Sequence, residues 1–316
     1  KENQVYLPLT LEMGSWIWVK KNPLQLFSRT GMYNPIKQHR LNRTLRRHRP
    51  FFDYILHSLY SHQVWTNEEM AASKLIGEKA KVYTMSNSLP KEWVLIRGLL
   101  RSKYHWKNFG AELQQALGAD KIHFVELAGN GFLSEQLTPV KIDEAVKQLH
   151  AQLPANLKNY GLLGISLGGM LATHWAQLYA DEIQQLVLIN SSSRLSSFNK
   201  RLIPKNYVSI LKVLASGRPE QAEEFILSTT SNFKEIWQPH LQDNIEFLKQ
   251  HPIRSENFVR QLVLSIQANF KKAPECRKLI LCSKADGLVH YSCSEDIAKA
   301  WNCEIRYHEA QATIYL

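Results

Sequence analysis

The stretch that decides the fold is Tyr160-Gly-Leu-Leu-Gly-Ile-Ser-Leu-Gly-Gly169, which contains a Gly-x-Ser-x-Gly match at 164–168. The apolar residues before Ser166 are typical of a buried strand, and the run 170–176 after it has a helical pattern. A serine on such a tight strand-to-helix turn has a strained backbone and tolerates only small neighbours. The N–H groups of the helix N-terminus then face the serine, where they stabilise a developing oxyanion. This context favours Ser166 as a nucleophile over an ordinary turn residue.

Strand and helix patterns alternate on both sides of this motif. Buried-strand runs lie at 93–96, 122–127, 162–163, 186–189, 278–282 and 303–307, and helical spacing at 106–117, 142–153 and 295–301. Such alternation predicts an α/β fold with a mostly parallel sheet flanked by helices. Residues 196–275 interrupt it with amphipathic helices at 207–215, 219–227, 244–250 and 256–270. We expect this helical segment to be a lid over the strand ends, where open α/β sheets bind ligands.

The positive charge of the chain is concentrated in its N-terminal quarter. The net charge is +11, and residues 1–84 carry 13 Lys and Arg residues against 6 Asp and Glu residues. A basic helical face for nucleic acid or anionic lipid within residues 37–49 is one interpretation of this segment, which contains Arg40, Arg43, Arg46, Arg47 and Arg49. The excess charge therefore gives no argument for nucleic-acid binding by the remaining residues.

Other features of the sequence favour an ordinary reduced cytoplasmic protein without a metal. The four cysteines, Cys276, Cys282, Cys293 and Cys303, lack the spacing of metal ligands. No apolar run reaches the roughly 18 residues that a membrane span requires, and the N-terminal residues lack a signal-peptide pattern. We expect a cytoplasmic location, no cofactor and no transmembrane segment.

The chain resembles the α/β-hydrolase superfamily over roughly residues 92–313. The resemblance rests on the Ser166 motif, on Arg97-Gly98-Leu99 after the first core strand, and on Gly129-Asn130-Gly131 after the next. It implies a lidded serine hydrolase with the chain order nucleophile, acid, histidine. It further implies that the backbone N–H groups of Leu99 and Leu167 form the oxyanion hole. Arg97 replaces a histidine that many relatives have, and it is either a structural ion-pair residue or a substrate-facing one.

The resemblance places the acid at Asp286, in Ser283-Lys-Ala-Asp-Gly-Leu-Val289 after the strand that follows the lid. Its role there is to orient the histidine and to stabilise the imidazolium. An Asp-Gly pair is also a strong turn signal, so a purely structural turn is the competing interpretation.

The histidine is absent from its expected place, because no Gly-His follows the last strand. His308 ends that strand and is the remaining candidate in the expected order, although an ordinary strand-terminal residue is the favoured interpretation. The genetic code permits codons for Gln311-Ala-Thr-Ile-Tyr-Leu316 whose second frame encodes Gly-His-Asp-Leu-Pro. We hypothesise that one nucleotide is missing near codon 311, which places the lost histidine at position 313, now Thr313.

These patterns divide the chain into four parts. Residues 85–195 form the first part of the hydrolase core, 196–275 the lid, and 276–316 a second core part that is C-terminally truncated or frameshifted. Residues 1–84 are an appendage, or upstream sequence read through in frame ahead of Met85.

The sequence as a whole predicts a serine esterase or thioesterase that acts on a small molecule with an apolar acyl group. The alternative is a catalytically inactive binding protein or a decayed gene product, because the histidine is missing.

The frameshift hypothesis makes a direct prediction about the gene. Independent DNA sequencing across codons 305–320 should find one additional nucleotide near codon 311 and restore Gly-His-Asp-Leu-Pro. Codons that are incompatible with that second frame contradict the hypothesis.

Overall fold

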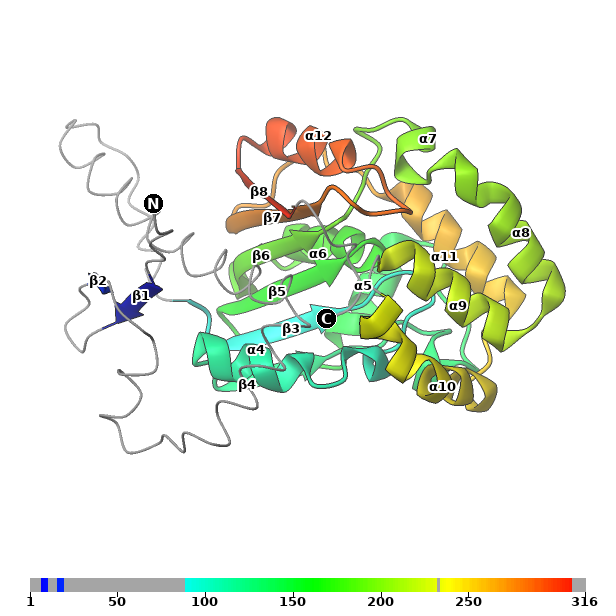
Figure 1. Cartoon of the computed structure of the whole chain (residues 1–316). Coiled ribbons are helices and arrows are strands. Elements are labelled where there is room, and N and C mark those ends of the chain that lie inside the picture. The colour runs from blue at the N-terminus through cyan, green and yellow to red at the C-terminus, as the bar shows by residue number, and fades with distance from the viewer. Residues whose placement is uncertain (1–6, 11–15, 20–88, 232–233, 309–316) are drawn as a thin grey trace, which may run out of the picture. The chain divides into compact units, whose positions relative to one another are not determined.

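The computed structural model describes residues 7–10, 16–19, 89–231 and 234–308 (Figure 1). The chain divides into two compact units, Lys1–Pro50 and Phe51–Leu316. In the first unit, β1 (Leu7–Thr10) pairs antiparallel with β2 (Trp16–Val19). The basic residues 37–49, Met85, Thr313 and the other residues after His308 lie outside the described residues.

The second unit is built on a six-stranded sheet in the order β4-β3-β5-β6-β7-β8, in which every pairing is parallel. Its strands are β3 (Glu92–Ile96), β4 (Lys121–Phe124), β5 (Tyr160–Ile165), β6 (Ile183–Ile189), β7 (Arg277–Ser283) and β8 (Glu304–His308). The α/β class predicted from the alternating patterns is therefore confirmed. All carboxyl ends of parallel strands meet at one edge, which is where such sheets bind ligands.

Helices cover both faces of this sheet, as the alternation requires. The core helices are α4 (Phe109–Leu117), α5 (Ile142–His150), α6 (Leu167–Leu178) and α12 (Ser292–Trp301), with 3-10 turns η1 (Lys103–Trp106), η2 (Gly131–Leu133) and η3 (Ala180–Glu182). Val94 and Ile96 join one buried cluster with side chains of α5, α6 and α12, while Trp93 and Leu95 join another with α4. Alternate residues of a strand thus face opposite layers.

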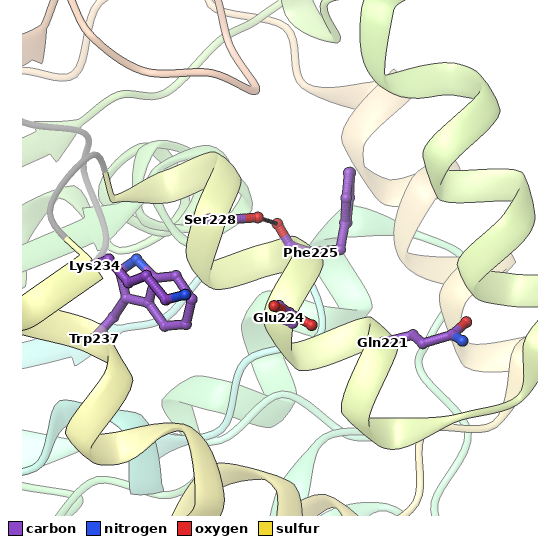
Figure 2. Close-up of a pocket in the computed structure, with 6 residues that line it drawn as sticks. All are labelled: Gln221, Glu224, Phe225, Ser228, Lys234 and Trp237. Carbon is purple, nitrogen blue, oxygen red and sulfur yellow. Dashed lines mark hydrogen bonds between the residues drawn. The ribbon is translucent and has the colours of Figure 1, made fainter.

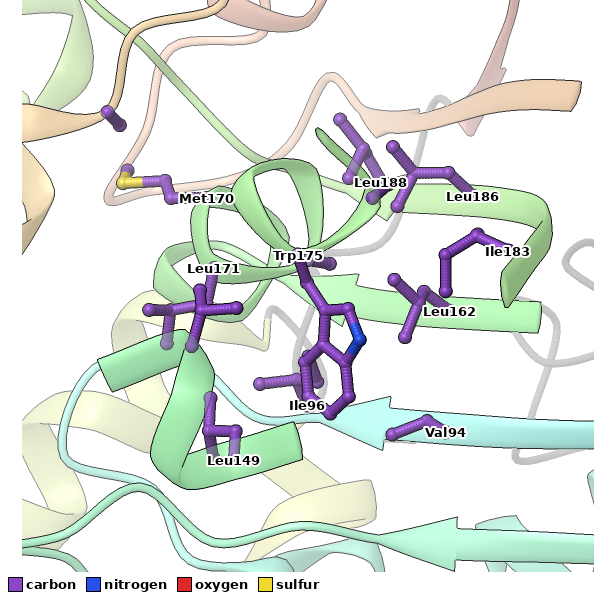
Figure 3. Close-up of a cluster of buried hydrophobic side chains, with 14 of the residues drawn as sticks. Val94, Ile96, Leu149, Leu162, Met170, Leu171, Trp175, Ile183, Leu186 and Leu188 are labelled. Atoms are coloured by element: carbon purple, nitrogen blue, oxygen red, sulfur yellow. The ribbon is translucent and has the colours of Figure 1, made fainter. Parts of the chain in front are cut away.

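Trp175 anchors α6 to the sheet. Figure 3 shows its indole directed from α6 toward the strands, among Val94, Ile96 and Leu162. The side chain is fully buried, and its Nε1 donates a hydrogen bond to the Tyr160 hydroxyl at 3.0 Å. The indole therefore has its one donor satisfied, as a buried tryptophan requires.

Residues between β6 and β7 form a helical insertion (residues 196–275). It contains α7 (Phe198–Arg201), η4 (Pro204–Asn206), α8 (Tyr207–Ser216), α9 (Pro219–Thr230), α10 (Lys234–Gln250) and α11 (Ser255–Gln267). The helix expected at 244–250 begins ten residues earlier, at Lys234, and α10 therefore includes Pro239. A proline removes one intrahelical hydrogen bond, and α10 continues through it while packing against α9.

Two further boundaries differ from the sequence expectation. Trp106 was expected to begin a helix that continues to Leu117, but it ends η1, and Lys107 breaks the helix with a φ of 46° before α4 begins. β6 starts at Ile183 rather than Leu186, because Gln184 and Gln185 interrupt the apolar pattern at the start of the strand.

Candidate active site

Ser166 occupies the turn between β5 and α6 in a strained backbone conformation. Its φ is 52° and its ψ is −117°, a region that non-glycine residues rarely adopt. The turn is held on both sides: the Ser166 N–H donates to the carbonyl of Ile189 at 3.0 Å, and the Ser191 hydroxyl donates to the Ser166 carbonyl at 2.9 Å. The Ser166 side chain does not cap α6. This is the geometry of a nucleophile elbow.

Close backbone contacts explain why glycines surround Ser166. A Cβ atom on Gly164 would lie 2.4 Å from the Gly168 carbonyl oxygen, and one on Gly168 would lie 2.2 Å from the Ile96 carbonyl oxygen. A Cβ atom on Gly98 would lie 3.3 Å from the Ser166 Cβ. Because the first two contacts are to backbone, no side-chain rotation relieves them. The Gly-x-Ser-x-Gly pattern is therefore a packing requirement of this turn.

Two backbone N–H groups are available as oxyanion donors near Ser166. Leu167 begins α6, so its N–H lies at the helix N-terminus and has no intrahelical acceptor. Leu99 follows Gly98 in the loop after β3. Among the described residues, neither Leu99 nor Leu167 donates its N–H to a hydrogen bond. The positive end of the α6 dipole adds to the stabilisation of an anion there.

Arg97, at the start of the same loop, is buried against an aromatic ring. Its guanidinium lies over the indole of Trp106, 4.6 Å from the ring centroid, and only 6% of the residue is exposed. A cation held over an aromatic face is a stabilising contact. This contact agrees with a structural role for Arg97.

Asp286 lies in the loop after β7, where its carboxylate accepts several hydrogen bonds. Oδ1 accepts from the N–H groups of Leu288 at 2.7 Å and Val289 at 3.0 Å, and Oδ2 accepts from Asn190 Nδ2 at 2.6 Å. The first two bonds are those of an Asx turn, and the third links the loop to Asn190 at the end of β6. Sequence analysis missed Asn190, whose only signal is its position directly after a buried strand.

The sheet brings the predicted site residues Ser166, Asp286 and His308 to one edge. Ser166 follows β5 and Asp286 follows β7, while His308 ends β8 opposite Ser283. No hydrogen bond joins the Ser166 hydroxyl to a histidine among the residues that the structure describes. Thr313 lies outside those residues. The catalytic roles of Ser166, Asp286 and His308 therefore stay predictions.

A buried network connects the helical insertion to the loops of this edge. We call it the polar seam, and it consists of Arg101, Asn130, Glu223, Asn244 and Gln261. Arg101 and Glu223 form a two-bonded ion pair at 2.6 and 3.0 Å, and Asn244 Nδ2 donates to Glu223 at 2.7 Å. Gln261 Nε2 donates to Asn130 Oδ1 at 2.7 Å. Nothing in the periodicity of the sequence indicated these partners, which lie more than 100 residues apart in most cases.

Glu126 and His105 are buried and form hydrogen bonds with the loop after β3. The Glu126 carboxylate accepts from the Ser102 hydroxyl at 3.1 Å and from the Lys103 N–H at 3.2 Å. Burial nevertheless raises the pKa of Glu126 to about 7. Burial, and next the nearby Arg101 and Arg97 charges, lower the pKa of His105 well below its usual value. His105 is therefore neutral, and its Nδ1 accepts from the Ser102 N–H at 3.0 Å.

A pocket of about 500 Å³ lies between α9 and α10 of the helical insertion (Figure 2). It is lined by Gln221, Glu224, Phe225, Ser228, Lys234 and Trp237. The end of α9 also contacts the loop of Asp286, because the Gly287 N–H donates to the Thr229 carbonyl at 3.2 Å. One of the two helices that line the pocket, α9, therefore also contacts the loop of the predicted acid, Asp286.

The described residues show no sign of a metal site or a membrane span. They contain no group of three or more His, Cys, Asp or Glu side chains that could hold a metal ion, and all four cysteines are free thiols. None of the helices in these ranges has both the length and the apolar character needed to cross a bilayer.

Comparison with known proteins assigns the chain to a class. The model of the alpha/beta hydrolase fold family matches residues 94–313, and the chain belongs to this family. The resemblance seen in the sequence is thereby confirmed.

Particular relatives carry esterase and hydrolase names. The chain is 26% identical over 227 residues to the pimeloyl-(acyl-carrier protein) methyl ester esterase of Aliivibrio fischeri, covering 68% of this chain and 83% of that protein. It is 28% identical over 210 residues to the protein of the same name from Vibrio atlanticus, covering 62% and 79%. The enol-lactonase from Burkholderia xenovorans has a similar fold, with a TM-score of 0.54 and 17% identity over 72% of this chain and 85% of that one.

The buried Glu126 generates a prediction about pH. Its folded-state pKa of about 7 lies above the usual glutamate value, so the folded protein binds the extra proton between those two pH values. The free energy of unfolding should therefore decrease as pH rises from about 4.5 to about 7, by on the order of 3 kcal/mol for this group. Urea unfolding at pH 5, 6, 7 and 8 measures the slope.

Two variants isolate this effect. Glu126→Gln should remove the part of the pH dependence of the free energy of unfolding that Glu126 contributes. Glu224→Gln removes one exposed carboxyl group and serves as the control for the loss of a charge. Equal slopes for wild type and Glu126→Gln contradict the prediction.

Proposed function

We propose that this protein is a serine hydrolase that cleaves an ester or thioester through an acyl-enzyme at Ser166. The observation that carries the proposal is the backbone of Ser166, which has a φ of 52° on a strand-to-helix turn packed by glycines. Such strain persists only where the surrounding structure enforces it, and it is typical of functional residues. The family membership and the esterase names of the relatives support the same reaction class.

The chemistry follows from the groups around the turn. The Ser166 hydroxyl attacks the substrate carbonyl, and its proton passes to a histidine base. The N–H groups of Leu99 and Leu167 donate to the tetrahedral oxyanion. Collapse of this intermediate expels the alcohol or thiol, which takes the proton, and water then hydrolyses the acyl-enzyme. Asp286 orients the histidine and stabilises its charged form. These steps need no metal and no organic cofactor.

The substrate proposed is a small molecule with an apolar acyl group. Phe225 and Trp237 give the pocket in the helical insertion an apolar part, and we propose that the insertion is a lid over the substrate. Because relatives are named methyl ester esterases, acyl methyl esters are the first substrates to assay. The free thiols agree with a reducing, cytoplasmic location, which we propose as well. We propose no nucleic-acid partner.

An inactive binding protein is the second candidate. The observation in its favour is that the Ser166 hydroxyl has no histidine partner among the described residues. Such a protein keeps the fold and the pocket while losing turnover, since fold alone does not determine function.

Replacement of the nucleophile tests the first candidate. Ser166→Ala should lower hydrolysis of acyl methyl esters by about three to six orders of magnitude and abolish labelling by a fluorophosphonate. The control is Ser197→Ala, because Ser197 is an exposed serine whose hydroxyl contacts only Asn199 in the described structure. Equal labelling of Ser166→Ala and wild type rules out the proposed nucleophile.

Two further variants decide which residue is the base. If His308 is the base, His308→Ala should lower kcat by at least about a thousandfold. If the base belongs at position 313, His308→Ala should leave the activity unchanged, and Thr313→His should raise it. Steady-state kinetics with one methyl ester distinguishes these outcomes, and no effect of either variant favours the inactive binding protein.

A further inference from the structure

Gln261 of α11 contacts the loop that carries the proposed oxyanion donor. Its Oε1 accepts the Leu100 N–H at 2.9 Å, directly beside Leu99. Its Nε2 donates to Asn130 Oδ1 at 2.7 Å and to Thr138 Oγ1 at 3.3 Å. The residue is fully buried. One side chain of the helical insertion thus joins the loops that follow β3 and β4.

The turn that Gln261 contacts is conformationally unfavourable for its sequence. The Arg101 N–H donates to the Gly98 carbonyl at 3.1 Å, which closes a four-residue turn from Gly98 to Arg101. Leu100, the third residue, has a φ of 56°, whereas Leu99 is not among the residues with positive φ. This is the pattern of a type II turn, which favours glycine at its third position. A leucine there costs roughly 1–2 kcal/mol.

The strain at Leu100 therefore needs an opposing interaction, and Gln261 provides it. The hydrogen bond from the Leu100 N–H is partly buried and its acceptor Gln261 is fully buried, so its loss leaves this donor without its protein acceptor. Asn130, which Gln261 also holds, donates through Nδ2 to the Arg101 carbonyl at 3.2 Å at the end of the same turn. Gln261 thus fixes the turn directly at Leu100 and indirectly at Arg101.

The position of this turn matters for the chemistry at Ser166. Gly98 packs against the elbow, since a Cβ on Gly98 would lie 3.3 Å from the Ser166 Cβ. The Leu99 N–H lies between Gly98 and the strained Leu100. If Leu100 relaxes to a negative φ, the path of the chain from Gly98 to Arg101 changes, and the Leu99 N–H moves with it. Displacements of about 1 Å at a catalytic donor can cost about a hundredfold in rate.

We propose that Gln261 is a positioning residue, which holds the strained turn Gly98–Arg101 so that the Leu99 N–H faces the oxyanion formed at Ser166. The helical insertion then contributes to the oxyanion hole as well as covering the site. The catalytic consequence rests on the proposed function, whereas the effect on the conformation of the turn does not.

The experiment compares two glutamines of the same helix. Gln261→Met removes both hydrogen-bonding groups at similar volume. Gln267→Met is the matched control, because Gln267 also holds backbone, accepting from the Ile142 N–H at 3.2 Å and donating to the Val140 carbonyl, but at a different loop. Hydrogen–deuterium exchange of the peptide 97–102 should be about tenfold faster in Gln261→Met and unchanged in Gln267→Met.

One second-site variant separates positioning from general destabilisation. Leu100→Gly removes the strain, so Gln261→Met should have a much smaller effect on exchange in that background. Equal exchange in Gln261→Met and Gln267→Met, or no reduction by Leu100→Gly, overturns the proposal.

Kinetics provide the readout that a merely structural residue does not affect. With a methyl ester substrate, Gln261→Met should lower kcat by about 10- to 100-fold with KM changed by less than about threefold. Leu100→Gly should restore part of that kcat. If wild type shows no Ser166-dependent hydrolysis, the proposed function fails, while the exchange measurement still decides the position of the turn.

Discussion

The rest of the structure depends on the direct contact of backbone with backbone around Ser166. β3, β5 and α6 meet there with no side chain between them, as the distance of 2.2 Å from a Cβ on Gly168 to the Ile96 carbonyl shows. This approach lets α6 begin directly at the end of β5 and lie across the sheet, where Trp175 fills the cluster around Val94 and Ile96. The turn, the helix and the main core cluster therefore depend on one another.

The helical insertion is attached to the core by apolar contacts, such as Leu264 in the main core cluster, and also by buried polar contacts. Arg101 and Glu223 are almost fully buried, at side-chain exposures of 3% and 0%. Removing either partner of such a pair leaves an uncompensated charge, which typically costs 3–5 kcal/mol. The outer helix α8, in contrast, exposes Val208 and Leu211. The insertion thus has a tightly fixed inner layer, made by α9, α10 and α11, and a more exposed outer helix.

This distinction explains how far the sequence could predict the molecule. The fold and the elbow follow from local patterns, because a buried strand, a Gly-x-Ser-x-Gly turn and an amphipathic helix each leave a signal within about ten residues. Asp286 could be proposed only from the resemblance to the family and its chain order. The partner of Asp286, Asn190, is 96 residues away, and that of Arg101 is 122 residues away. Such pairs depend on tertiary packing, and a single sequence contains no periodicity that indicates them.

The backbone conformations at the carboxyl edge of the sheet support the proposed function of this edge. Three non-glycine residues with positive φ follow three neighbouring strands: Leu100 after β3, Ser166 after β5 and Asn190 after β6. Each costs of order 1–3 kcal/mol unless its surroundings compensate.

Each of the three is held by a hydrogen bond to a different element. Leu100 donates to Gln261, Ser166 donates to the Ile189 carbonyl, and Asn190 Oδ1 accepts from the Ser283 N–H at 2.7 Å. A fold that needed only to connect strands to helices would be more stable with glycine or relaxed turns at these positions. Strain that is repeated along one edge, and opposed at each point by a specific bond, agrees with the proposal that side chains and N–H groups of this edge are held in place for chemistry.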